Sequence, residues 1–299
     1  MPTDDGSSPV ERTRLTRRSI VLGAAAAATL ARPAIARAGF GRTVKFGLTP
    51  VFLTNDLVLL DGLRKYLAEA SGFEVELVQR KTYQEIVSLL VSDNLDLAWI
   101  CGYPYVAFRD RLELVAVPQW RGRPLYSSYL IITNGRIVKS LSELRDDIHA
   151  FSDPDSNSGY LVTCASLMAM GQRPEQFFRR SIFTHGHRNV VRAVGSGLAM
   201  SGSVDGYVWE VLAETEPHLT ARTRIIARSE PLGFPPIACS RRRAHAPELA
   251  AVRQALLVMG NDPLGKPLLD MLRLDGFVPG EASLFDGIAE MARIVRSAT

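Results

Sequence analysis

The stretch FSDPDSNSGY, residues 151–160, decides the fold because it joins a strand-like run to a helix-like run through small polar side chains. The apolar residues of 148–151 predict a buried strand, which Pro154 ends because proline cannot donate to a sheet. The largely apolar run of residues 159–170 predicts a helix that Gly171 closes.

Ser156, Asn157 and Ser158 fall at the entrance of that predicted helix. Unpaired backbone N–H groups, the positive end of the helix dipole and short polar side chains can converge there on a small oxyanion. The sequence therefore predicts an anion-binding cradle. The alternative is an ordinary N-cap, which uses the same residue types and is the simpler interpretation of the loop alone.

A calcium-binding loop is the other kind of site that this stretch could form. Asp153, Asp155 and Asn157 stand at EF-hand spacing. The sixth position is Ser158 rather than glycine and the twelfth is Cys164 rather than glutamate, so the calcium interpretation fails.

Length and charge set the broad class. A chain of 299 residues with 46% hydrophobic content can bury a full core and suggests two lobes. Residues 1–38 carry about three of the four net positive charges, so the remainder is close to neutral. This balance gives no reason to expect a nucleic-acid partner.

Residues 1–38 have the three parts of an export signal. These are a basic stretch with the pair Arg17-Arg18, an apolar run over 20–30, and Ala36 and Ala38 at a cleavage position before Gly39. The segment resembles a twin-arginine signal peptide, which predicts export to the periplasm of a bacterium.

Strand and helix patterns alternate along the mature chain, which predicts a parallel sheet with helices on both faces and ligands beyond the carboxyl ends of the strands. Both Tyr83 and the turn over 101–105 fall near such ends. The predicted strands span 43–48, 73–78, 95–100, 149–151, 181–184 and 203–208, and the predicted helices span 56–71, 83–91, 247–259 and 267–299.

Two segments, 125–133 and 234–240, have the pattern of chain crossings between lobes. They predict an α/β protein with discontinuous lobes, in which the helical tail packs back on the first lobe. The predicted boundaries are 41–125 plus 237–299 for lobe 1 and 129–233 for lobe 2.

Five motifs in order resemble the phosphate/phosphite/phosphonate-binding family of periplasmic receptors that serve ABC transporters. They are KTYQEIVSLL with Tyr83, DLAWICGYPYV with Tyr105, FSDPDSNSGY, HGHRNVVRAV with His187 and SVDGYVWE with Asp205. The resemblance implies a type II periplasmic binding protein fold, with a two-strand hinge and a central cleft.

The resemblance also implies the function. The serine-rich loop would grip the oxygens of a small oxyanion, and tyrosines and acids would close over it from the opposite lobe. The implied partner is an ABC permease, and we expect a monomer with no cofactor, no metal and no enzymatic activity. The expected ligand-binding residues are Tyr83, Cys101, Tyr103, Tyr105, Ser156, Asn157, Ser158, His187 and Asp205.

Two departures from the family pattern bear on the ligand. Asn157 replaces the usual threonine of the loop, and Cys101 with Tyr103 stands where glycine and proline are common. A thiol at the cleft also resembles family members that bind arsenite and signal to a sensor histidine kinase, because trivalent arsenic suits thiolate. The alternative is that Cys101 is a small buried hydrophobe.

Three cysteines leave at least one free thiol or an intermolecular bridge. Cys164 lies in an apolar helix and is expected in the core, whereas the sequence gives no preference for Cys239. Cys101 with His187 is the one nucleophile and base that can be paired, and neither lies in a known nucleophile motif.

The remaining candidates are weaker. His185 and His187 would share one face of a strand, but no third metal ligand stands nearby in sequence. Asp205 beside Tyr207 could also be a solvated pair in a turn. The run 241–243, three arginines, is either a solvated charge run or a docking patch for a membrane partner.

Overall fold

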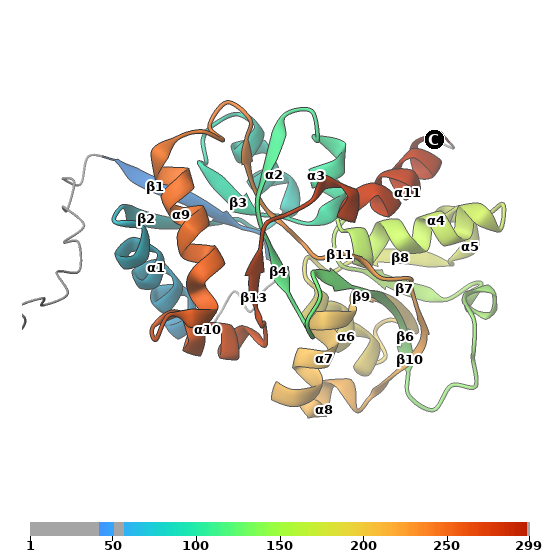
Figure 1. Cartoon of the computed structure of the whole chain (residues 1–299). Coiled ribbons are helices and arrows are strands. Elements are labelled where there is room, and N and C mark those ends of the chain that lie inside the picture. The colour runs from blue at the N-terminus through green and yellow to red at the C-terminus, as the bar shows by residue number, and fades with distance from the viewer. Residues whose placement is uncertain (1–41, 51–56, 298–299) are drawn as a thin grey trace, which may run out of the picture. The chain divides into compact units, whose positions relative to one another are not determined.

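The computed structural model describes residues 42–50 and 57–297, and the predicted export signal therefore lies outside the described residues (Figure 1). The first of two large sheets has the order β13-β4-β12-β3-β1-β2. In it β1 runs parallel to β2 and β3, and β12 runs antiparallel between β3 and β4. Its strands are β1 (Thr43–Leu48), β2 (Glu74–Gln79), β3 (Leu97–Trp99), β4 (Leu112–Gln119), β12 (Ile237–Ser240) and β13 (Gly276–Val278).

Helices α1 and α9 pack against each other and against the first sheet, and α2 packs on β1, β3 and β12. Thr82 and Glu85 form a capping box that starts α2 at Tyr83. The helices of this part are α1 (Leu57–Ser71), α2 (Tyr83–Val91), α3 (Gly102–Ala107), α9 (Pro247–Val258), α10 (Gly265–Leu272) and α11 (Asp286–Ser297), with 3₁₀ turns η3 (Met259–Asn261) and η4 (Ala282–Phe285).

The second sheet has the order β10-β6-β9-β7-β8, with β7 parallel to β8 and β9 and with β6 antiparallel to β9 and β10. Its strands are β6 (Ser128–Thr133), β7 (Ile148–Phe151), β8 (Arg180–Phe183), β9 (Ser201–Asp205) and β10 (Thr223–Arg228). Its helical segments are η1 (Leu141–Leu144), the π-helix η2 (Asn157–Leu161), α4 (Val162–Ala169), α5 (Pro174–Phe177), α6 (His187–Gly195), α7 (Gly206–Thr215) and α8 (Pro217–Thr220).

The two sheets share one strand order. The orders are β2-β1-β3-β12-β4 in the first sheet and β8-β7-β9-β6-β10 in the second. In each sheet, the strand that follows a chain crossing, β12 or β6, lies antiparallel to the third strand of this order, β3 or β9. The short strands β5 (Leu125–Tyr126) and β11 (Leu232–Gly233) pair with each other where the chain crosses. This arrangement confirms the predicted two-lobe α/β class with two crossing segments.

Several predicted elements differ in the structure. The strand expected over 203–208 ends at Asp205, because this side chain accepts a hydrogen bond from the Val208 amide and starts α7. The helix expected from residue 159 begins two residues earlier, as a π-helical turn. The tail is not wholly helical, because 276–278 pairs with β4 as β13. Strand β4 was not predicted.

The tail contacts both lobes. Helix α9 packs back on β4, β13 and α1, and α10 packs on α1 and η3, which agrees with the prediction that this part of the tail returns to the first lobe. Helix α11 instead packs on α3 and also on α4 and η2 of the second sheet (Figure 1). The side chains of Ile288 and Phe285 lie against Gly102, so the last helix borders the loop that follows β3.

Candidate functional site

Five helical segments begin where the predicted site residues meet. Tyr83, Asn157 and His187 are the first residues of α2, η2 and α6, while Cys101 and Asp205 are the caps that precede α3 and α7. Two hydrogen bonds join residues of these ends across the two lobes, and a third joins Asp205 to His187 within the second lobe. Helix N-termini carry partial positive charge and unpaired N–H groups, so this convergence favours a negatively charged ligand.

The cradle loop serves both as a cap and as a source of free donors. The Ser156 hydroxyl accepts from the Gly159 amide at 3.0 Å, so the ordinary N-cap interpretation is correct for this residue. Ser158 is fully buried; its hydroxyl lies near the Tyr126 hydroxyl but makes no hydrogen bond of normal geometry with a described residue. The Asn157 amide oxygen and the Ser152 hydroxyl also lack a partner among the described residues. A buried polar atom without a partner is costly, so these three atoms point to a polar ligand.

The other wall of the site meets the cradle directly. The Asn157 backbone amide donates to Cys101 Sγ at 3.1 Å, and the Tyr83 amide lies 3.4 Å from a carboxylate oxygen of Asp153. Tyr83 and Cys101 come from the first sheet, whereas the loop follows β7 of the second. The structure therefore brings predicted residues of both lobes together.

His187 holds a fixed orientation in this group. Its Nδ1 accepts from the Asp205 amide at 3.0 Å, so the proton of the neutral ring lies on Nε2, 3.3 Å from the Tyr83 hydroxyl. Burial lowers the pKa of His187 to about 3, so the ring is neutral at physiological pH. Tyr83 accepts this hydrogen bond and keeps its own proton free to donate to a ligand.

Gly159 allows the ring to approach the cradle. A Cβ atom at this position would lie 1.9 Å from the Ser152 hydroxyl oxygen and 2.9 Å from Cε1 of His187. A side chain cannot be accommodated at that distance, so the glycine is required for close packing of the loop against the histidine.

Asp205 is a carboxyl group of the second lobe whose charge acts on these phenols and the thiol, and Asp153 is a second carboxyl group near Tyr83. Asp205 is buried, and burial raises its pKa to about 7. Burial raises the pKa of Tyr83, Cys101 and Tyr126, and the charge of Asp205 adds to the rise in all three. None of the ion pairs between described residues includes Asp205, so its charge is not neutralised by a cationic side chain.

Tyr126 belongs to this group and was missed by the sequence analysis. Its hydroxyl accepts from the Asn157 side-chain amide at 2.9 Å, and burial raises its pKa well above the usual range. Like Tyr83, it keeps a proton to donate. Its position in the first crossing segment, 125–133, was the signal available, because crossing segments border both lobes. We call Tyr83, Cys101, Tyr126, Asn157, Ser158, His187 and Asp205 the central cluster.

Three predicted residues lie outside the central cluster: Ser156, which caps η2, and two tyrosines. The Tyr105 ring packs on Phe285 at 4.8 Å between centroids, and its hydroxyl faces the charges of Arg109, Glu113 and their neighbours. Half-buried Tyr103 lies near Asp155 and Cys164. The structure therefore does not bring either tyrosine to the orphaned hydroxyl groups.

All three cysteines are free, buried and protonated. Burial raises the pKa of Cys101 to about 11, and those of Cys164 and Cys239 to about 12. Cys164 lies in α4, as expected for a core residue, and Cys239 lies in β12.

The weaker candidates also have defined places. His185 is exposed with a left-handed backbone (φ 54°) in the turn before α6, so it does not share a strand face with His187. Among the described residues, no group of histidine, cysteine and acidic side chains is arranged to hold a metal ion. The arginines of 241–243 pair with Glu113, Asp93, Asp96 and Glu248, which favours a solvated charge run. No helix in the described part of the chain is both long and apolar enough to cross a bilayer.

Comparisons with known proteins show the family of this chain. A family model described as "ABC transporter, phosphonate, periplasmic substrate-binding protein" matches residues 46–285. A curated relative, the phosphate-import protein PhnD of Mycolicibacterium smegmatis, is 28% identical over 173 residues, which are 53% of this chain and 54% of the relative. The chain thus matches about half the length of that relative.

Two solved structures share the fold. PhnD1 from Prochlorococcus marinus in complex with methylphosphonate aligns with a TM-score of 0.74 and 20% identity, covering 85% of this chain and 98% of that chain. A binding-protein component of an ABC phosphonate transporter from Pseudomonas aeruginosa aligns with a TM-score of 0.76 and 20% identity, covering 85% and 86%. The chain belongs to the family of periplasmic substrate-binding proteins of phosphonate ABC transporters.

Proposed function

We propose that this protein captures a tetrahedral phosphorus oxyanion of the phosphonate, phosphite or phosphate class in the central cluster and presents it to an ABC permease. The observation that carries this proposal is the buried, unpartnered hydroxyl of Ser158 at a point where several helix N-termini meet. The methylphosphonate bound to the Prochlorococcus relative supports the ligand class.

The roles follow from the hydrogen bonds. Ser158, Tyr83 and Tyr126 would donate to the oxygens of the ligand. The Ser158 hydroxyl makes no hydrogen bond of normal geometry with a described residue, and Tyr83 and Tyr126 each accept a hydrogen bond, from His187 and Asn157, so their own protons can turn to the ligand. Asp205 would accept a hydrogen bond from a protonated oxygen of the ligand. Asn157 would contribute the free end of its side-chain amide.

The wider setting is part of the same proposal. We propose lobe boundaries of 41–125 plus 237–299 and 129–233, with the two crossings as the hinge. The first range holds the strands of the first sheet, and the second holds those of the second sheet except Ser128, the first residue of β6. The protein would act as a monomer after export, and the twin-arginine route is proposed from residues 1–38 alone.

A thermal-shift screen of the mature chain with phosphate, phosphite, methylphosphonate, sulfate, arsenate and arsenite tests the ligand class. A ligand at a hundred times its Kd stabilises the folded protein by about 2.7 kcal/mol. We expect stabilisation by phosphorus oxyanions. Stabilisation by sulfate alone, or by none of the panel, would contradict the proposal.

The Ser158→Ala variant should bind the best phosphorus ligand of that screen with a Kd increased roughly ten- to a hundredfold. A hydrogen bond to a charged oxygen contributes about 1.5–3 kcal/mol. Calorimetry measures the change, and Ser166→Ala on the exposed face of α4 is the matched control. Equal affinity of Ser158→Ala and the parent would mean that the loop only caps a helix.

Cys101→Ser separates the phosphorus ligand from the arsenite alternative. The thiol is protonated and its sulfur accepts from the Asn157 amide, so we propose that it packs and accepts rather than binds arsenic. Serine can also accept, and we expect the Kd for a phosphorus ligand to change by less than about threefold. Arsenite binding by the parent that Cys101→Ser abolishes would instead support a receptor that signals to a histidine kinase.

A further inference from the structure

Helix α7 links the central cluster to a second set of contacts between the two lobes. Its cap, Asp205, belongs to the cluster. Tyr207, Glu210 and Glu214 follow at three- and four-residue intervals, which places them on one face of the helix. Each of these three side chains contacts a residue that follows a strand or helix of the first lobe.

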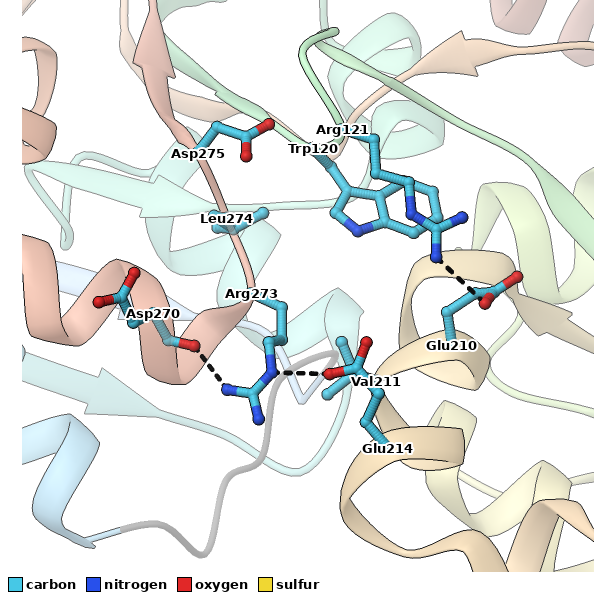
Figure 2. A pocket seen from close by; sticks show the side chains of 9 residues that line it. All are labelled: Trp120, Arg121, Glu210, Val211, Glu214, Asp270, Arg273, Leu274 and Asp275. Atoms are coloured by element: carbon cyan, nitrogen blue, oxygen red, sulfur yellow. Dashed lines mark hydrogen bonds and ion pairs between the residues drawn. The ribbon is translucent and has the colours of Figure 1, made fainter.

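Two of these contacts are ion pairs that join one lobe to the other. Arg121 lies 3.2 Å from Glu210, and Arg273 lies 2.8 Å from Glu214 (Figure 2). With Trp120, these four side chains line a cavity of about 490 Å³ between α7 and the end of α10. The ion pairs therefore stand on two sides of one gap between the lobes.

The third contact is uncharged. The Tyr207 hydroxyl donates to the carbonyl oxygen of Leu272 at 2.5 Å, and its ring meets Trp120 edge to face at 5.8 Å between centroids. Leu272 ends α10 and Trp120 follows β4, so both belong to the first lobe. The same face of α7 thus combines a hydrogen bond, an aromatic contact and two ion pairs.

The first-lobe side is held in position for these contacts. Arg121 and Gly122 both have positive φ, 52° and 75°, in a tight turn closed by the bridge between Trp120 and Arg123. The Gly122 amide donates to an Asp275 carboxylate oxygen at 2.7 Å, which fastens the turn to the strand β13 region. The Arg121 guanidinium rests over the Trp120 ring and points toward α7 (Figure 2).

We propose that the α7 face of Tyr207, Glu210 and Glu214 is an interlobe latch that sets the affinity of the receptor. The latch contacts join different lobes, so opening the cleft breaks them while each lobe stays folded. An interaction made only in the closed state shifts the equilibrium toward that state and lowers the apparent Kd of a ligand that binds there. This inference rests on the proposed function, because it assigns the latch to the same ligand site.

The solvent exposure of the two arginines limits how much the latch can change ligand affinity. The side chains of Arg121 and Arg273 are 61% and 42% exposed, so water and salt weaken both ion pairs. Exchanging attraction for like-charge repulsion at one pair should weaken ligand affinity about three- to tenfold. The effect should shrink as salt is raised, because screening acts on attraction and repulsion alike.

The test uses a charge reversal and its rescue. Arg273→Glu places two carboxylates face to face, and adding Glu214→Arg restores an ion pair of opposite direction. We expect the single variant to bind methylphosphonate about three- to tenfold more weakly and the double variant to recover to within about twofold of the parent. Arg121→Glu should act in the same direction. Arg241→Glu, opposite Glu113 within the first lobe at similar exposure, is the matched control and should change nothing.

A ligand-free measurement separates this inference from the proposed function. Cysteines introduced at Leu264 and Ile137, both exposed and in different lobes, carry spin labels, and the three native cysteines are buried and stay unlabelled. We expect Arg273→Glu to move the distance distribution between the labels toward longer values, and the double variant to reverse that change. Identical distributions in all three proteins would overturn the latch, even if ligand binding is as proposed. A shifted distribution in a protein that binds no phosphorus oxyanion would keep the latch and refute the ligand.

Discussion

The Asp205→Asn variant should be more stable than the parent without ligand and should bind its ligand about a hundredfold more weakly. In the folded protein the pKa of Asp205 is about 7, against 3.8 for an exposed aspartate. A group whose pKa is raised by folding binds extra protons in the folded state, so the free energy of unfolding falls as pH rises from about 4 to 7. Above pH 7 the parent carries this cost in full, up to roughly 4 kcal/mol.

Asparagine removes the charge and keeps the cap, because its side-chain oxygen can still accept from the Val208 amide. At pH 8 we therefore expect a free energy of unfolding higher by roughly 2–4 kcal/mol in chemical denaturation without ligand. The same change replaces an acceptor for the ligand's O–H by an amide, which accounts for the loss of affinity at about 1.5–3 kcal/mol per charged hydrogen bond.

Asp147→Asn is the matched control. Asp147 is as buried as Asp205, but it pairs with Arg136 through two contacts at 2.7 and 2.9 Å. Removing that carboxylate leaves an unpaired arginine, so this variant should lose stability and keep its affinity. An Asp205→Asn protein that is destabilised and binds like the parent would show that the carboxyl is only a helix cap.

Local patterns in the sequence predicted the parts of the fold that local physics decides. The alternation in TVKFGL matches β1, and the capping box at Thr82 fixes the start of α2 at the predicted Tyr83. Tyr83, Asn157 and His187 were predicted from motifs and do come together, because each starts a helix at the same edge of its sheet. Their role as ligands remains a proposal.

The features that the sequence did not reveal depend on partners far along the chain. The arginines of 241–243 looked free because the acids that pair with them lie up to about 150 positions away. Tyr105 lies four residues after Cys101, a spacing that places two side chains on one face of a helix. Cys101 is the extended N-cap of α3 (ψ 156°) and not a helical residue, so this rule does not apply to the pair. Tyr126 was missed because its neighbour Asn157 is 31 residues away.

The central cluster contains donors and a carboxyl, and the hydrogen bonds that join it involve no cationic side chain. Helix N-termini therefore have to supply the positive potential. They are fixed by the fold, whereas Tyr83, Tyr126 and Ser158 can orient their hydroxyl protons. A site of this kind suits a ligand that both accepts hydrogen bonds and donates one, as a singly protonated phosphorus oxyanion does.

The free energy of unfolding of this protein should decrease as the pH falls below 6.5, because two buried histidines are neutral in the folded state. Burial lowers the pKa of both His149 and His187 to about 3, from 6.5 for an exposed histidine. Through these two histidines the unfolded chain binds up to two more protons than the folded state between these values, which makes the free energy of unfolding fall as pH decreases. Each histidine contributes about 1.4 kcal/mol per pH unit. Asp205 has the opposite effect, because its raised pKa makes the folded state bind one more proton than the unfolded chain. Stability should therefore be greatest near pH 6.5–7.

The His149→Gln variant removes one of the two buried histidines and leaves the residues of the central cluster unchanged. The ring of His149 is hydrogen-bonded through both nitrogens, to Ser201 and Ser203, and is stacked on Phe178 at 4.2 Å between centroids. The variant will lose packing and have a lower free energy of unfolding at every pH, so the informative quantity is the slope. Between pH 6 and 4 we expect the slope to decrease by about 1.4 kcal/mol per pH unit. Exposed His245→Gln is the control and should keep the parent's slope; an unchanged slope in His149→Gln as well would mean that His149 is not the buried neutral group.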